Sequence, residues 1–309
     1  MLKLRREYTA TNSPLIVLVF LLFPLPLSLC QTAQLSSRAK TGNPIIEGWY
    51  ADPELRIYED AFYLYPTTST SFNNQTFFDA FFSSDLLTWQ RAGRILDFAD
   101  VPWTTDRAAW APTVGYKDGS YFLYYSAGDG VGIGVAVSKS PAGPFKDVLE
   151  AAARGELSVL GRRGHALWRV ADDMVSFKGG FREVTPEKAY VEAPWMLKRK
   201  GVYYFFYSVG GWGDPSYAVK YVKGDSPLGP FSGPSKLILS SDPAIGTSTG
   251  HNSVFNVGDQ YYIVYHRRPP GDGARDHRVV CIDRMYFTDN GEIEVVKITN
   301  EGVDGVTLK

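Results

Sequence analysis

The stretch KGVYYFFYS at 200–208 repeats a pattern that occurs three more times: EDAFYLYPT at 59–67, DGSYFLYYS at 118–126 and GDQYYIVYH at 258–266. Each segment opens with a tight polar turn and continues into an aromatic-rich run of strand length. This order is typical of a hairpin that leads into a buried strand. Because the turn elements SPAGPF (140–145) and SPLGPF (226–231) recur as well, the sequence predicts an all-β repeat architecture.

The spacing of the repeats predicts a β-propeller. Their equivalent aromatic residues are separated by 59, 82 and 58 positions, and stand at Phe62, Tyr121, Tyr203 and Tyr261. A unit of about 60 residues suits one four-stranded propeller blade. A two-sheet β-sandwich, which also has many short strands, is the alternative. The interval of 82 is anomalous, because it is too long for one blade and too short for two.

Residues 1–33 are predicted to be a secretory signal peptide. A basic start precedes an apolar run from Pro14 to Cys30, and polar residues follow. A membrane anchor is the alternative, but this run is interrupted by two prolines and is short for a span of roughly 20 residues. We therefore expect a secreted, extracellular protein in which residues 34–309 form a single domain.

The composition without the predicted signal peptide excludes several partners. It holds 29 basic and 32 acidic residues, so nothing in the charge attracts nucleic acid or anionic lipid. Cys281 is then the only cysteine, and no intrachain disulfide can form. Asn74-Gln75-Thr76 is the one clear sequon for N-glycosylation.

Two carboxylates stand in aromatic, proline-marked contexts ahead of repeat strands. Asp52 lies in GWYADPE, where Pro53 is expected to bias it towards an extended conformation. Glu192 lies in YVEAPWM, an apolar setting of the kind that raises a carboxyl pKa. Glycoside hydrolysis requires two such groups, one ionised and one protonated. An Asp in an ordinary turn and a surface Glu at a strand start are the alternatives.

Four segments of the chain resemble glycoside hydrolase family 43. NPIIEGWYADPE resembles the first-blade motif of the family, and RAAWAPTVGYKDGSYFLYYS resembles its second-blade segment. EAPWMLKRKGVYYFFYS resembles the segment that carries the general acid, and GHNSVFNVGDQYYIVYHRR resembles the fifth-blade segment. The match runs in order from about residue 43 to residue 297. The resemblance implies a five-bladed β-propeller with arabinofuranosidase, xylosidase or arabinanase activity.

By this resemblance, Asp52 is the general base that activates water, and Glu192 is the general acid that protonates the departing oxygen. Trp110 and Trp212 are aromatic platforms for a sugar ring, with a place in a blade core as the alternative. His251 matches the axial His of the family, which in many members lies beside a calcium or other ion. A buried core His is the alternative there. The resemblance implies no required cofactor, and an axial calcium at His251 is the one ion it suggests.

The family carries a third carboxylate that this chain lacks. It is an Asp in an Ile-Asp-Pro strand of the third blade, where it tunes the pKa of the acid and orients the sugar. Between Lys146 and Glu192 there is no Asp-Pro pair, and Asp172 and Asp173 stand in a turn-like context that makes them poor substitutes. This missing Asp-Pro pair and the interval of 82 residues between Tyr121 and Tyr203 together predict an incomplete third blade that lacks roughly twenty residues. A true deletion and an error in the gene model explain it equally well.

The leading hypothesis is a monomeric, secreted, inverting glycosidase that cleaves arabinose- or xylose-containing plant cell-wall polysaccharides such as arabinan and arabinoxylan. In an inverting enzyme the two carboxyl groups lie roughly 6.5–9.5 Å apart. A catalytically weakened carbohydrate-binding propeller is the alternative, because the third Asp is missing, and a structural propeller with protein partners is a third. Arg267, Arg268 and Arg278 are either sugar-binding residues or surface and inter-blade groups, and stay unassigned.

Overall fold

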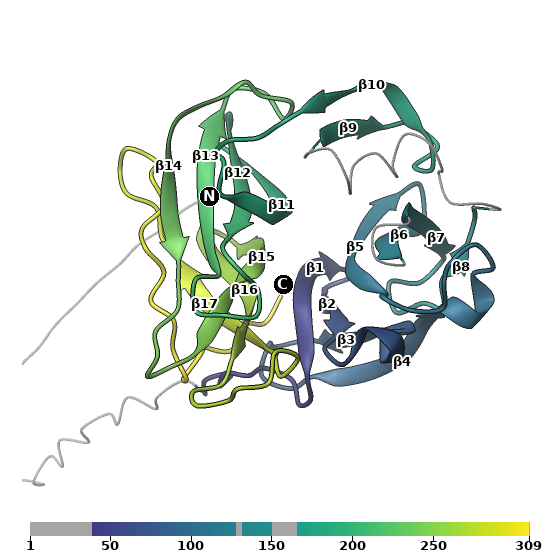
Figure 1. Cartoon of the computed structure of the whole chain (residues 1–309), viewed down its shortest axis with the longest axis horizontal. Helices are drawn as coiled ribbons and strands as arrows, with labels where there is room; N and C mark the ends of the chain where they lie inside the picture. The colour runs from purple at the N-terminus through teal and green to yellow at the C-terminus, as the bar shows by residue number, and fades with distance from the viewer. Residues whose placement is uncertain (1–38, 128–131, 150–165, 309) are drawn as a thin grey trace, which may run out of the picture. The chain divides into compact units, whose positions relative to one another are not determined.

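The computed structural model describes residues 39–127, 132–149 and 166–308. In this part the chain is an all-β propeller, with sheets arranged around a centre (Figure 1). The described helices are two single turns, η1 (Phe72–Asn74) and η2 (Phe98–Asp100). The predicted signal peptide lies outside the described residues. None of the helices in the described ranges is long and apolar enough to cross a membrane.

Four antiparallel sheets in the described ranges have the size of propeller blades. The first contains β1 (Tyr50–Tyr58), β2 (Ala61–Thr68), β3 (Phe77–Ser83) and β4 (Gln90–Asp97). The second contains β5 (Trp110–Lys117), β6 (Ser120–Ala127), β7 (Gly132–Ser138) and β8 (Lys146–Asp147). Another contains β11 (Tyr190–Arg199), β12 (Val202–Val209), β13 (Ala218–Gly224) and β14 (Phe231–Leu239). The last contains β15 (Thr247–Val257), β16 (Gln260–Arg268) and β17 (Val279–Met285).

A two-stranded sheet lies between the second blade and the blade of β11 to β14. It consists of β9 (Ala166–Val170) and β10 (Phe177–Glu183), which pair antiparallel (Figure 1). The prediction of five blades is therefore not confirmed, because the described residues form four sheets of blade size and this one pair of strands. The residues that precede the pair, 150–165, lie outside the described part of the chain.

The aromatic repeats are the second strands of the four blades, as their pattern predicts. They coincide with β2, β6, β12 and β16, and each follows a tight turn. In three of these turns both central residues have positive φ, which is the geometry of a type I′ hairpin turn. These pairs are Glu59-Asp60 (50° and 61°), Asp118-Gly119 (50° and 72°) and Lys200-Gly201 (48° and 84°). Such turns match the twist of the strands that they join.

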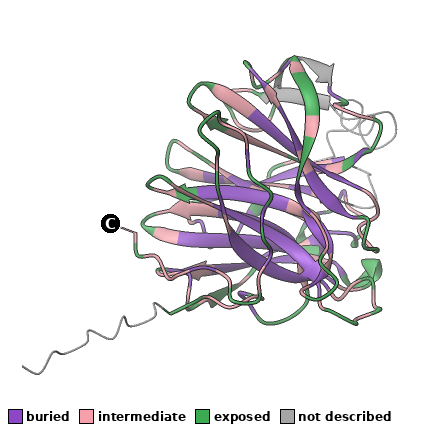
Figure 2. Cartoon of the chain, turned by 90° about the vertical axis from the view of Figure 1, so that its left-hand side faces the viewer, coloured by how far each residue is buried: buried purple, intermediate pink, exposed green. Residues whose placement is uncertain are grey.

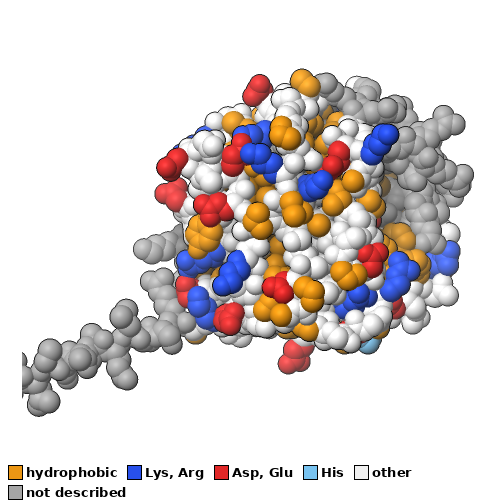
Figure 3. Space-filling model, turned by 60° about the vertical axis from the view of Figure 1, so that its left-hand side comes forward, with side chains coloured by type: hydrophobic (Ala, Val, Ile, Leu, Met, Phe, Trp, Pro, Cys, Tyr) orange, Lys and Arg blue, Asp and Glu red, His pale blue; other side chains and the backbone are white. Residues whose placement is uncertain are grey.

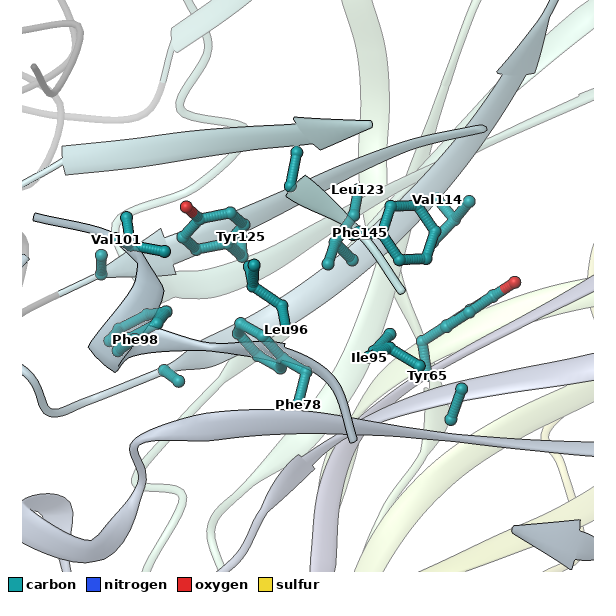
Figure 4. Packing of buried hydrophobic residues seen from close by; sticks show 14 of the residues in the cluster. Tyr65, Phe78, Ile95, Leu96, Phe98, Val101, Val114, Leu123, Tyr125 and Phe145 are labelled. Atoms are coloured by element: carbon teal, nitrogen blue, oxygen red, sulfur yellow. The ribbon is translucent and has the colours of Figure 1, made fainter. Parts of the chain in front are cut away.

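Aromatic side chains fill the space between neighbouring blades. Figure 4 shows one such core, between the first and second blades, where Phe78, Phe98 and Tyr125 pack with ring centroids 5.5–6.0 Å apart. Each of these three residues is no more than 1% exposed. Figure 2 shows that buried residues run along the strands, while exposed residues gather at turns and edges. The blades are thus held together by apolar burial, which makes the largest favourable contribution to folding.

The two ends of the described chain meet at the last blade. The side-chain amide of Asn43 donates to the Ile282 carbonyl in β17, and the Ile45 N–H donates to the Val280 carbonyl. The Thr41 N–H in turn donates to the Val303 carbonyl. On the face drawn in Figure 3, basic and acidic side chains are interspersed, without a continuous patch of one sign. This agrees with the balanced charge of the sequence.

Candidate active site

The four strands nearest the centre each carry a β-bulge beside one common cavity. The register of β1, β5, β11 and β15 shifts there. Each bulge contains a non-glycine residue with positive φ, and these are Asp52 (49°), Ala111 (47°), Ala193 (59°) and His251 (49°). A bulge leaves one residue unpaired and re-aims its neighbours. The cavity wall is thus built from the irregular positions of four separate strands.

A proline follows the bulged residue in three of these strands. Pro53, Pro112 and Pro194 stand directly after Asp52, Ala111 and Ala193. Proline has no N–H to donate to a sheet, so it is tolerated where a bulge interrupts the ladder. The prediction that Pro53 would make Asp52 extended is wrong, because the φ of Asp52 is in the left-handed region. The bulge and the contacts of the Asp52 backbone and side chain outweigh the local preference of a residue before proline.

Asp52 is buried at the cavity wall and surrounded by three nitrogen-bearing side chains. Its Oδ1 lies 3.2 Å from His251 Nδ1, 3.3 Å from His266 Nδ1 and 3.4 Å from Arg278 Nη1. Burial alone would raise the pKa of this carboxyl. The charges of His251 and Arg278 outweigh burial and hold the pKa of Asp52 well below its ordinary value. Asp52 is therefore ionised at neutral pH, as a general base must be.

His266 supports Asp52 from behind as a neutral ring. The Asp52 backbone N–H donates to His266 Nδ1 at 3.1 Å, so Nδ1 accepts and cannot also donate to the carboxylate. The ring is fully buried, and burial lowers the pKa of His266 to about 4. The neutral ring therefore carries its proton on Nε2, which has no hydrogen-bond partner in the part of the chain that the structure describes.

Glu192 lies in the bulge of β11 and lines the same cavity. Its Oε1 accepts a hydrogen bond of 2.8 Å from the hydroxyl of Tyr217. The Tyr217 ring stacks on His266 with centroids 5.6 Å apart, and His266 in turn contacts Asp52. A continuous set of contacts thus joins two carboxylates that are 140 residues apart in the sequence. Both predicted catalytic residues face one cavity.

Gly250 makes the position of Tyr217 possible. A Cβ atom at Gly250 would lie only 2.0 Å from the Tyr217 ring, so any other residue would displace that ring. Tyr217 is completely buried, and burial together with the negative charge of Glu192 keeps its pKa well above the ordinary value. Tyr217 is therefore a protonated hydrogen-bond donor that fixes the Glu192 carboxyl.

The cavity has a volume of about 590 Å³ and a rim of aromatic side chains. Trp110 and Trp212 both line it, and both contact Phe72, at centroid distances of 5.1 and 6.4 Å. Arg275 and Arg278 lie over the Trp212 ring, 4.0 and 4.7 Å from its centroid. Apolar rings that border a polar cavity are typical of a small-molecule site. Both tryptophans thus stand at the cavity and not in a blade core.

His251 also lines the cavity, at the position predicted for the axial His. Within residues 39–127, 132–149 and 166–308, no group of three or more His, Cys, Asp or Glu side chains is placed to hold a metal ion. Calcium prefers six to eight oxygen ligands, and side chains here do not supply such a set. The axial calcium at His251 stays a prediction.

The three arginines that the sequence leaves unassigned have separate positions. Arg267 donates to the Thr299 carbonyl and to the Asn300 side chain, so it ties the C-terminal segment to β16. Arg268 donates to the Gly213 carbonyl in the loop of Trp212. Of the three, only Arg278 lines the cavity, where it contacts Asp52 and donates to the Ser69 hydroxyl at 3.0 Å.

Glu54 is a third carboxylate at the cavity, and the sequence analysis does not single it out. It is 6% exposed, and burial raises the pKa of its side chain. Its Oε1 lies 2.5 Å from Arg56 Nε, and its Oε2 accepts a hydrogen bond of 3.2 Å from Trp195 Nε1. Its place two positions after Asp52 on one strand is the signal that could have identified it.

Asp172 and Asp173 do not replace the missing third Asp. They lie in the exposed turn between β9 and β10, where Asp173 accepts hydrogen bonds from the N–H groups of Val175 and Ser176. The Asp172 side chain is 93% exposed. Neither residue is among those that line the cavity.

The chain matches the model of the protein family described as Glycosyl hydrolases family 43, over residues 41–160 and 160–293. It is also 50% identical over 333 aligned residues to a beta-D-galactofuranosidase from Aspergillus niger, an alignment that covers 96% of this chain and 98% of that protein. It is 28% identical to xylosidase/arabinosidase 43A from Humicola insolens, over 82% of this chain and 99% of that protein.

Solved structures share the fold. One is a GH43 beta-xylosidase/alpha-arabinofuranosidase from a compost microbial metagenome, in complex with xylotriose. It superposes with a TM-score of 0.69 at 24% identity, over 84% of this chain and 98% of that chain.

Proposed function

The chain belongs to glycosyl hydrolases family 43, and on this premise we propose that it is an inverting, exo-acting glycosidase with Asp52 as the general base and Glu192 as the general acid. The observation that carries the proposal is the common cavity of these two carboxylates, one of which is held ionised by its neighbours. Glycosidases of this kind need one carboxylate on each side of the scissile bond.

In the proposed reaction, Asp52 takes a proton from a water molecule, and the water oxygen attacks the anomeric carbon. The bond between that carbon and the leaving oxygen breaks, and Glu192 gives its proton to the leaving oxygen. Arg278 and His251 lower the basicity of Asp52 but keep it charged and oriented. Tyr217 orients Glu192 through its hydroxyl. The surroundings of Asp52 hold it ionised, as the base of an acid–base pair must be.

The substrate is proposed to be a terminal glycoside, with furanosides preferred. The relative that is 50% identical over nearly the whole chain is named as a beta-D-galactofuranosidase, which makes a β-D-galactofuranoside the first candidate. More distant relatives are named as xylosidase/arabinosidase, so α-L-arabinofuranosides and β-xylosides of arabinan and arabinoxylan are the second. β-D-Galactofuranose and α-L-arabinofuranose share the configuration of the ring and differ in the exocyclic arm. One cavity can therefore accept both.

The enzyme is proposed to act outside the cell as a monomer after removal of residues 1–33. The basic start and the apolar run of that segment support secretion.

A panel of nitrophenyl glycosides tests the activity. We expect release of nitrophenol from β-D-galactofuranoside, with weaker release from α-L-arabinofuranoside and β-D-xyloside. The double variant Asp52→Asn with Glu192→Gln, purified in the same way, controls for contaminating glycosidases. Equal release by the variant and the parent would remove the assignment of these residues.

A weakened, carbohydrate-binding propeller is the second candidate, and the alignment with the Aspergillus niger relative favours it. The alignment has 333 positions, and it includes about 297 residues of this chain, which is 96% of its 309 residues. Roughly 36 positions of the alignment therefore hold a residue of the relative but none of this chain. The two family matches meet at residue 160, inside the stretch that precedes β9. We propose that β9 and β10 are what this chain retains of a third blade in a five-bladed ring. Binding of a glycoside without turnover would support this candidate.

A further inference from the structure

Asn252 has a buried side-chain amide that bonds to nothing in the described part of the chain. The residue is 3% exposed and lines the cavity that holds Asp52 and Glu192. Neither its Nδ2 nor its Oδ1 has a hydrogen-bond partner among the residues that the structure describes. Buried polar atoms in folded proteins almost always have a partner, and each exception calls for an explanation.

The bulge of β15 places this amide at the cavity. Gly250 pairs with His266 and Ser253 pairs with Val264, so the two residues between them face a single residue of β16. These two are His251, which contacts Asp52, and Asn252. The next residue, Ser253, turns the other way and accepts a hydrogen bond of 3.1 Å from the Leu55 N–H. Asn252 thus lines the cavity next to His251, the residue that contacts Asp52, and its amide has no partner among the described residues.

The chemistry of the amide fits a sugar. An amide offers one acceptor oxygen and a nitrogen with two donor hydrogens, side by side in a plane. Two adjacent ring hydroxyls can donate to the oxygen and accept from the nitrogen at the same time. A polar group that is buried without a hydrogen-bond partner costs free energy, and a ligand that bonds to the amide removes this cost.

We propose that Asn252 binds a pair of adjacent ring hydroxyls of the sugar that enters the cavity. This inference rests on the proposed glycosidase function and adds the residue that recognises the ring. A residue kept for ligand binding contributes little to folding, because its polar atoms have no partner in the folded chain. Replacing it by an apolar side chain of similar size should therefore leave the fold stable and weaken the ligand.

The experiment compares Asn252→Leu with Ser253→Ala, both in the Glu192→Gln background that prevents turnover. Urea unfolding measures stability, and calorimetry measures the binding of methyl β-D-galactofuranoside and methyl α-L-arabinofuranoside. For Asn252→Leu we expect an unchanged or higher unfolding midpoint and a dissociation constant that is roughly 10- to 100-fold larger. For Ser253→Ala we expect the reverse, a lower midpoint and unchanged binding, because that hydroxyl holds β1 and not the sugar.

Two results would overturn the inference. Asn252→Leu with a lower midpoint and unchanged binding would show that the amide has a structural partner. Asn252→Leu that binds both glycosides as tightly as its parent would exclude contact with the ring, whatever its stability. Failure of the proposed glycosidase function would give a different result. The Glu192→Gln parent would bind neither glycoside, and the unmodified chain would hydrolyse no member of the nitrophenyl panel. The role proposed for Asn252 would then fail together with the glycosidase function.

Discussion

Asp52 shows how neighbouring charges keep a buried carboxylate ionised. Burial favours its neutral form, yet His251 and Arg278 at 3.2 and 3.4 Å reverse that preference. The backbone N–H of the same residue is bound by His266, so that both main chain and side chain of Asp52 are held. Asp52, the proposed general base, is therefore ionised at neutral pH, and its lowered pKa makes it a weak base.

The roles proposed for Asp52 and Glu192 predict that their variants depend differently on the leaving group. Asp52→Asn should lower kcat/KM by about 10²- to 10⁴-fold for every substrate, because each needs an activated water. Glu192→Gln should cost as much for a poor leaving group but much less for dinitrophenol, which leaves without protonation. Steady-state rates on a series of phenyl furanosides measure this, with circular dichroism as a control for folding. Equal losses across the series in Glu192→Gln would contradict its role as the acid.

The sequence predicts which residues line the cavity better than it predicts the residues that hold them in place. Asp52, Glu192, Trp110, Trp212 and His251 all line the one cavity, as their motifs indicated. The residues that hold them were not predicted: Tyr217, His266, Glu54 and Arg278. Their roles depend on contacts between strands far apart in the chain, and on bulges whose positions follow from three-dimensional pairing. A proline directly after Asp52, Ala111 and Ala193 is a local signal of the bulges in β1, β5 and β11.

At the level of strands, the hydrogen bond between Glu54 and Trp195 joins β1 to β11, the two strands that carry Asp52 and Glu192. Glu54→Leu should lower the free energy of unfolding by about 1–3 kcal/mol, because it leaves the Trp195 N–H and the Arg56 guanidinium unpaired. Glu54→Gln keeps an acceptor for Trp195 and should cost less. Urea unfolding measures the coupling energy between the Glu54 and Trp195 side chains. It requires Glu54→Leu, Trp195→Phe and the double variant that combines them. Strictly additive losses would show that the two side chains do not stabilise one another.

The strands themselves were largely predictable, and the third blade was not. Polar turns followed by aromatic runs identified β2, β6, β12 and β16, because a buried strand between two others is apolar on both faces. The same reasoning finds no aromatic hairpin between Asp147 and Glu192. In this interval the structure has the short antiparallel pair of β9 and β10. The sequence locates the irregularity through the interval of 82 residues, but it does not define the strands that form there.

At the level of the whole molecule, one buried carboxyl makes stability depend on pH. Burial raises the pKa of Asp283 to about 6, although Thr299 and Tyr265 donate hydrogen bonds to it. The folded state therefore holds this proton more tightly than the unfolded chain, whose pKa is near 3.8. Stability from this group is complete below pH 3.8 and is lost as the pH rises through 6. His266, whose pKa is lowered to about 4, acts in the opposite direction between pH 4 and 6.5.

Replacement of Asp283 by Asn isolates this contribution. Relative to Asp283→Asn, the wild-type chain should lose about 2 kcal/mol of unfolding free energy between pH 4 and pH 7. Urea unfolding of both proteins at pH 4, 5, 6 and 7 gives this difference directly, and titrations common to the two proteins cancel. A difference that does not change with pH would mean that Asp283 titrates normally.

A second property of the whole molecule is the completeness of its ring. If the positions of the Aspergillus niger relative that have no counterpart in this chain belong to a third blade, as proposed, their insertion at residue 160 should raise the melting temperature and the turnover number. The restored strands would pair with edges that are otherwise exposed. A Gly/Ser segment of the same length is the control, and it should give neither gain. If the native segment performs no better than the Gly/Ser segment, the missing residues are dispensable.

The stereochemistry of the first product tests the central claim most directly. If Asp52 activates water while Glu192 protonates the leaving oxygen, hydrolysis is a single displacement and the anomeric centre inverts. Proton NMR at early times, with nitrophenyl β-D-galactofuranoside as substrate, should show the α-anomer of galactofuranose first, followed by equilibration. First appearance of the β-anomer would mean retention through a covalent intermediate, and would contradict the roles given to Asp52 and Glu192.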